Sequence, residues 1–191
     1  MIGFDPALGL PAVAALRLGI VAAVLLARRR PELVRRLAFG GSAMASAIGL
    51  VTALAVLRGD AAIEGVWVAH AASGLSLSYA VDALSAWFLV VLAAVAIPIA
   101  IYSIGYVRHP PLNERSLFIG LAFNVLMAAV ELVLVADDVI AFLFAWELMT
   151  LATAALVATE HEIRAVRGAA FLYLVMSHVG TGALMVAFFA L

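Results

Sequence analysis

Long apolar runs separated by short polar segments make up most of this chain. A membrane-spanning helix needs about 20 mostly apolar residues to cross a hydrocarbon core about 30 Å thick. Six stretches meet this requirement, and no soluble domain or low-complexity segment lies between them. We therefore predict a single all-α membrane domain over residues 1–191, with helices at about 7–27, 37–57, 82–107, 117–136, 139–158 and 168–190.

The connection between the second and third helices has a different pattern. Leu75-Ser76-Leu77-Ser78-Tyr79 alternates apolar and polar side chains, which is the period of a β-strand. A first run, Val66-Trp67-Val68-Ala69-His70, precedes it, and Gly74 supplies a turn residue between the two. The pattern predicts a short β-hairpin on the outer side of the membrane.

Charged residues divide between the two sets of loops. The loops after the first, third and fifth helices carry arginines, whereas the other loops hold mostly acids. Arginine-rich loops stay in the cytoplasm, so we expect a multi-pass protein of the plasma (inner) membrane with both termini on the outer face. The arginine-rich set is Arg28, Arg29, Arg30, Arg35, Arg36, Arg108, Arg115, Arg164 and Arg167, and the opposite set is Arg58, Asp60, Glu64, Asp137 and Asp138.

Composition strengthens the membrane assignment. Hydrophobic residues make up 67% and charged residues 12% of the chain, against about 45–50% and about 25% in soluble domains. The basic residues are all arginines and form no basic tail, so a nucleic-acid partner is not indicated. Cysteine is absent, which excludes a disulfide or a thiolate-ligated iron–sulfur cluster in this chain, and no cofactor is expected.

Glu147 lies close to the centre of the fifth predicted helix, where a charge costs about 2.5–3.5 kcal/mol or more. Thr150 shares its helix face. The carboxylate either carries a proton or is a structural acid. We favour the proton-carrying role, because a glutamine would serve structure alone.

His178 lies near the middle of the sixth predicted helix, with Thr181 on its face. Counted from the outer ends of their helices, Glu147 is about 12 Å deep and His178 about 18 Å deep. The two groups can therefore meet directly or through a water, as a proton relay would require. Simple packing of His178 between helices is an equal alternative.

Five further ionisable residues lie at or within predicted helices, or in the outer turn. Glu131, Asp137 and Asp138 form an acidic outer mouth, which is either a proton or cation exit or, as we favour, a set of solvated helix ends. Arg17 lies in the middle of the first helix and is expected to be structural, facing an acid in another helix or subunit. Asp82 is expected to cap the third helix.

These residues resemble a known family. Residues 137–149, which include Phe144-Ala145-Trp146-Glu147-Leu148-Met149, are similar to the fifth-helix signature of antiporter-like subunits. Such subunits occur in respiratory complex I, membrane-bound hydrogenases and multisubunit cation/proton antiporters. Residues 76–85 resemble the start of the family's third helix, and Ser177-His178-Val179-Gly180-Thr181 is most similar to the hydrogenase-4 component B and formate hydrogenlyase branch.

The resemblance implies a role for Glu147 and a longer protein. In the family this glutamate pairs with a lysine on a seventh helix, and the pair couples redox chemistry elsewhere to proton movement. The present sequence has no lysine, so we expect it to be the N-terminal part of such a subunit, as a fragment or a truncated gene product.

Three functions compete. The first is a non-catalytic, proton-translocating subunit beside other membrane subunits and peripheral redox subunits, either nickel–iron hydrogenase-like or dehydrogenase. The second is a subunit of a cation/proton antiporter or ion-coupled uptake system, moving protons and possibly sodium. The third is a structural fragment that transports nothing. His178 and its surroundings favour the first.

Overall fold

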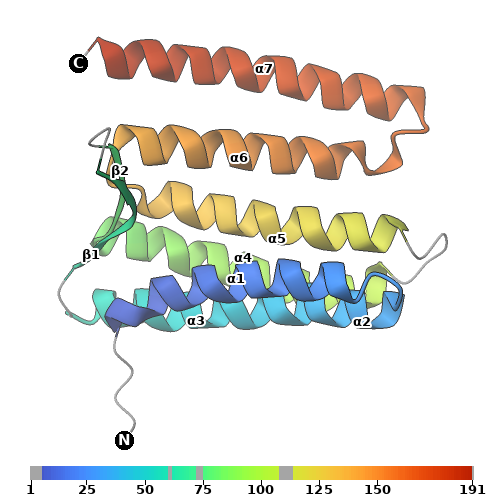
Figure 1. Ribbon diagram of the computed structural model, residues 1–191, viewed down its shortest axis with the longest axis horizontal. Coiled ribbons are helices and arrows are strands. Elements are labelled where there is room, and N and C mark those ends of the chain that lie inside the picture. The colour runs from blue at the N-terminus through green and yellow to red at the C-terminus, as the bar shows by residue number, and fades with distance from the viewer. Residues whose placement is uncertain (1–5, 60–61, 72–74, 108–113, 191) are drawn as a thin grey trace, which may run out of the picture.

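The six predicted membrane helices are all present in the computed structural model, which describes residues 6–59, 62–71, 75–107 and 114–190 (Figure 1). Gly74, Asp60, Arg108 and His109 lie outside the described residues. The helical elements are η1 (Pro6–Leu8), α1 (Gly9–Leu26), α2 (Pro31–Arg35), the π-helical turn η2 (Arg36–Gly40), α3 (Gly41–Leu57), α4 (Ala83–Tyr106), α5 (Glu114–Val135), α6 (Val139–Val157), η3 (Ala158–Glu160) and α7 (Arg164–Phe189).

Helix ends extend further than the apolar runs predict. The second membrane helix begins with α2 at Pro31 rather than at residue 37, and α7 begins at Arg164 rather than at residue 168. The apolar pattern marks only the hydrocarbon-spanning part, whereas the helices continue into charged segments at the membrane surface. Pro31 suits the first turn because its missing N–H has no helical partner there.

A stripe of small residues on α3 packs against α1. A Cβ at Gly41 would lie 2.8 Å from the Ile20 side chain, and Ala45 is fully buried. Close approach of two helix backbones through small residues is typical of membrane proteins. α4 packs on α3 in a similar way, through buried alanines, and continues past Pro98 without a break.

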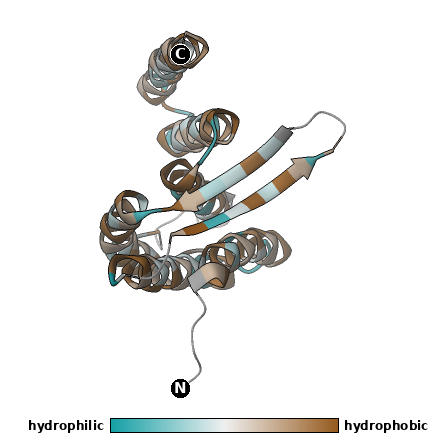
Figure 2. Ribbon diagram, turned by 90° about the vertical axis from the view of Figure 1, so that its left-hand side faces the viewer, coloured by the Kyte–Doolittle hydropathy of each residue, from teal (hydrophilic) through white to brown (hydrophobic). Residues whose placement is uncertain are grey.

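The predicted hairpin is present and is longer than expected. β1 (Ile63–His70) pairs antiparallel with β2 (Leu75–Val81), with an irregularity between Val66 and Val68. Viewed along the helices, the hairpin lies across their ends (Figure 2). Gly65 pairs with Tyr79, and a Cβ at Gly65 would lie 2.5 Å from the tyrosine ring, so only glycine leaves room for that ring.

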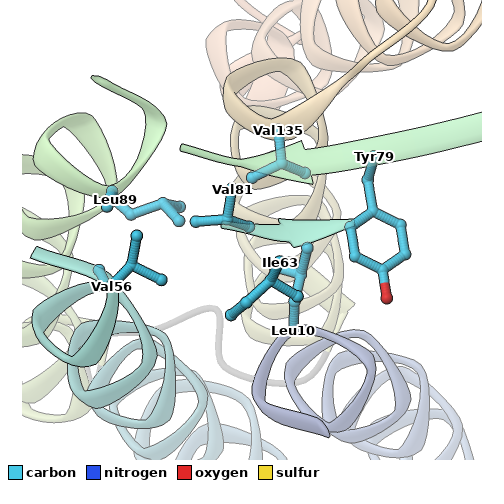
Figure 3. Close-up of a cluster of buried hydrophobic side chains, with 9 residues drawn as sticks. Leu10, Val56, Ile63, Tyr79, Val81, Leu89 and Val135 are labelled. Atoms are coloured by element: carbon cyan, nitrogen blue, oxygen red, sulfur yellow. The ribbon is translucent and has the colours of Figure 1, made fainter. Parts of the chain in front are cut away.

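A buried apolar cluster joins the base of the hairpin to the helices (Figure 3). It draws side chains from α1, α3, α4, α5 and both strands, which fixes one end of the helix bundle. Its members are Leu10, Ala53, Val56, Ile63, Tyr79, Val81, Ala86, Leu89 and Val135. Beyond this cluster, α5, α6 and α7 follow one another in a row, and α7 packs on α6 (Figure 1).

Candidate functional site

The structure brings Glu147 of α6 and His178 of α7 together. Consecutive antiparallel helices place the two side chains at a similar height, and His178 Nε2 lies 3.6 Å from Glu147 Oε2. The Glu147 side chain is 29% exposed and the His178 side chain 55% exposed. The depth estimate from the sequence therefore correctly indicated that the two groups are within reach.

A backbone contact orients the imidazole ring. His178 Nδ1 lies 2.8 Å from the carbonyl oxygen of Leu174, one turn earlier in α7. Because a carbonyl oxygen only accepts, the hydrogen in this bond lies on Nδ1. In the neutral ring, Nε2 then presents its lone pair toward Glu147.

The pair can hold one proton in two ways. It is either a neutral glutamic acid beside a neutral imidazole or a glutamate beside an imidazolium, and both forms have the same net charge. The 3.6 Å separation exceeds hydrogen-bond length, so transfer requires a small side-chain movement or a bridging water. Glu147 Oε1 is buried and has no hydrogen-bond partner among the described residues.

The two threonines predicted on the helix faces of Glu147 and His178 are both buried. Thr150 is 2% exposed and Thr181 is 4% exposed. Thr181 donates to the Ser177 carbonyl oxygen at 3.2 Å, within its own helix. Thr181 is one of the two buried residues of α7, with Ala170, so it marks the face on which α7 packs against α6.

A second charged cluster lies inside the helix bundle and is fully paired. Arg17 of α1 donates from Nε to Glu131 Oε2 at 2.6 Å and from NH2 to Glu131 Oε1 at 2.5 Å. Its NH1 and NH2 groups also donate to Ser42 Oγ and Ser46 Oγ of α3, each at 3.1 Å. The expected acid in another helix is therefore Glu131 of α5.

This placement corrects the interpretation of Glu131. The side chain does not lie at a solvated helix end beside Asp137 and Asp138, because the residue is 8% exposed and bonded to Arg17. The pattern along one helix could not reveal this, since the partner is 114 positions away. Sequence reasoning also missed Ser42 and Ser46, whose only signal was four-residue spacing on one face of α3.

The Arg17–Glu131 pair borders a cavity of about 320 Å³ between α1, α5 and α6. Most of its lining is aliphatic, and the hairpin contributes Trp67 and Leu77. Asn124 also borders it and donates to the Ala38 and Gly120 carbonyl oxygens, while its Oδ1 is buried without a partner in the described part of the chain.

The two aspartates of the α5–α6 turn differ in environment. Asp137 is exposed. Asp138 Oδ2 accepts from the Ser78 backbone N–H at 2.7 Å and from Ser78 Oγ at 2.9 Å, and Oδ1 accepts from the Ala141 N–H at 2.7 Å. Burial raises the pKa of Asp138, but these hydrogen bonds outweigh burial and leave the pKa below its ordinary value. Asp138 is thus a helix cap that also holds the hairpin.

Asp82 caps α4 as expected. Its Oδ1 accepts from the Ser85 backbone N–H at 2.7 Å, and this bond holds the pKa of Asp82 below its ordinary value.

Comparison with known proteins points to one group of membrane subunits. Residues 67–115, which span most of the hairpin and all of α4, match the family described as NADH-Ubiquinone oxidoreductase (complex I), chain 5 N-terminus. Hydrogenase-4 component B of Escherichia coli (strain K12) is 27% identical over 112 residues, or 59% of this chain. Two uncharacterized proteins from strains of Mycobacterium tuberculosis are 40% identical over 105 residues, or 55% of this chain.

These matches confirm the resemblance to antiporter-like membrane subunits. The matched family is described as an N-terminal segment, and the aligned segments span 16% of the length of each relative. The family match ends at Arg115, so it covers neither Glu147 nor His178. A role for those two residues is therefore a proposal, argued from their geometry and from the sequence resemblance.

Proposed function

We propose that this chain is part of a proton-translocating membrane-arm subunit of a respiratory oxidoreductase complex, of hydrogenase-4/formate hydrogenlyase or complex I type. Other membrane subunits surround it, and peripheral redox subunits carry the cofactors and the electron transfer. The observation that carries the proposal is the Glu147–His178 contact, with Oε2 and Nε2 3.6 Å apart inside membrane helices.

The geometry supports proton transfer for a specific reason. The Leu174 carbonyl holds the imidazole so that Nε2 faces the carboxylate, and the pair exchanges its proton without changing its net charge. A change of charge nearby would shift the balance between the neutral and the ionic form. Redox chemistry in a partner subunit can be coupled to proton movement in this way.

The test uses the complete complex in sealed membrane vesicles. Glu147→Gln and His178→Gln are expected to abolish proton translocation while electron transfer continues in part, because the amides cannot hold the shared proton. Glu64→Gln is the matched control, since Glu64 is exposed on the hairpin. An unchanged ratio of protons to electrons in Glu147→Gln would contradict the proposal.

Purification of the tagged complex tests the partner assignment. Hydrogenase-like or dehydrogenase subunits that co-purify would support it. Antiporter subunits without redox proteins, together with sodium-dependent proton flux, would replace it with the cation/proton antiporter function.

A further inference from the structure

The connection from α1 to α3 concentrates positive charge at one end of the bundle. Residues 28–36 contain five arginines and one glutamate, for a formal net charge of +4. Arg28, Arg29, Arg30 and Arg36 are exposed, and in the part of the chain that the structure describes their side chains make no hydrogen bond or ion pair. We refer to residues 25–36 as the arginine elbow.

The elbow has a defined shape. Arg30 donates its backbone N–H to the Ala27 carbonyl at 2.7 Å, and Pro31 then starts α2. The π-helical turn η2 follows directly and leads into α3. Phe39 of that turn is buried against Phe123 of α5 with ring centroids 5.6 Å apart, so the elbow is anchored to the bundle.

A buried arginine in the elbow is only partly satisfied. Arg35 is 5% exposed, and its NH2 group donates to Glu32 Oε2 at 2.6 Å. Its Nε is buried and has no acceptor among the described residues. A guanidinium offers five N–H donors in a fixed fork that matches phosphate oxygens, so an anionic oxygen would complete its hydrogen bonds.

Apolar side chains lie among these unpaired charges. Leu26 is 87% exposed, and Leu25 and Leu33 are also exposed. Leu25 and Leu26 form the last turn of the membrane helix α1, so they lie at the level where headgroups meet acyl chains. A water-soluble acidic partner would leave these leucines uncovered, whereas a phospholipid covers leucine and arginine together.

We propose that the arginine elbow binds anionic phospholipid, with the phosphodiester headgroup on the arginines and the acyl chains against Leu25, Leu26 and Leu33. Clusters of basic residues next to a membrane helix attract anionic headgroups. The elbow supplies several unpaired guanidinium groups on a short, anchored segment. This site is independent of the proton-transfer proposal, since it shares no residue with it.

The test measures lipid retention by the full-length protein in neutral detergent. Delipidated protein is offered phosphatidylglycerol or phosphatidylcholine, and the retained lipid is counted by native mass spectrometry. We expect preferential retention of phosphatidylglycerol, and a loss of about tenfold or more in its apparent affinity in Arg28→Gln/Arg29→Gln/Arg30→Gln. Detergent micelles have no sides, so altered membrane orientation does not enter the measurement.

Two controls make the outcome specific. Arg58→Gln removes an exposed arginine at the opposite end of the bundle and is expected to retain the lipid normally. If the triple variant does not fold, Arg29→Gln is compared with Arg29→Lys, because only the first substitution removes the positive charge. Inorganic phosphate is added as a competitor, and it should displace the lipid poorly because it has no acyl chain.

Three results would overturn the proposal. They are equal retention of both lipids by the unaltered protein, normal phosphatidylglycerol retention in the triple variant, and efficient displacement by inorganic phosphate.

Discussion

At the scale of single residues, the Arg17–Glu131 pair and the Glu147–His178 pair are opposite in character. Arg17 and Glu131 share two hydrogen bonds, and both serine hydroxyls of α3 add to them. Glu147 keeps a buried oxygen without a partner in the described residues and faces His178 beyond hydrogen-bond distance. The first pair is suited to hold helices together, and the second can change protonation state.

The Arg17–Glu131 pair should therefore contribute to stability rather than to proton movement. Arg17→Gln or Glu131→Gln leaves one buried charge unpaired and is expected to lower the free energy of unfolding by about 3–5 kcal/mol. The double variant removes both charges, so its cost should be clearly below the sum of the two. Unfolding in mixed detergent micelles measures this cycle.

Measuring proton translocation by the double variant distinguishes a structural role of the Arg17–Glu131 pair from a role in proton movement. We expect the intact complex carrying it to keep its proton-to-electron ratio, unlike Glu147→Gln. If the stability costs of the two single variants are additive, the two side chains do not stabilise each other. If a stably folded double variant loses proton translocation, Glu131 lies on the proton path.

At the scale of elements, Asp138 links the hairpin to the α5–α6 turn. Asp82 provides a matched comparison, because its carboxylate caps α4 through the Ser85 backbone N–H and, among the described residues, makes no hydrogen bond to a strand. An asparagine caps a helix as well as an aspartate does, so Asp82→Asn is expected to be nearly neutral. Asp138→Asn should cost about 1.5–3 kcal/mol, because an amide N–H₂ cannot accept from Ser78.

The Asp138 contribution should depend on pH in a defined direction. Its pKa is lower in the folded protein than the ordinary value of 3.8. The stabilisation is therefore fully present above that value and is lost as pH falls through the folded pKa. The difference in unfolding free energy between the unaltered protein and Asp138→Asn should be constant near neutral pH and shrink under acid. A difference that grows with acid would contradict this assignment.

Elements and contacts differ in how far the sequence predicts them. The six helices and the hairpin follow from local periodicity. The contact of Glu147 with His178 follows as well, because residues at similar depth in adjacent antiparallel helices lie near each other. The Arg17–Glu131 bond joins residues 114 positions apart, and Asp138 meets Ser78 across 60 positions. The hydropathy pattern of a single sequence shows that such charges are costly in a membrane. It does not indicate which non-adjacent helices pack together.

At the scale of the whole molecule, the charges separate along the helix axis. The arginine elbow, Arg115, Arg164 and Arg167 lie at one end of the bundle, and the hairpin with Asp82, Asp137 and Asp138 lies at the other (Figure 1). Arginine-rich ends remain in the cytoplasm. We therefore expect the hairpin on the outer face of the plasma membrane.

No cysteine occurs in residues 1–191, so a single thiol introduced there reports the side of the membrane on which its site lies. Glu64→Cys places a thiol on the exposed face of the hairpin, and His161→Cys places one at the arginine-rich end, where the side chain is 70% exposed. In intact cells, a membrane-impermeant maleimide should label the first variant at once and the second only after permeabilisation. The reverse pattern would place the hairpin in the cytoplasm. It would also invert the direction in which a proton from the outer face reaches Glu147, so this labelling should precede any assignment of entry and exit paths.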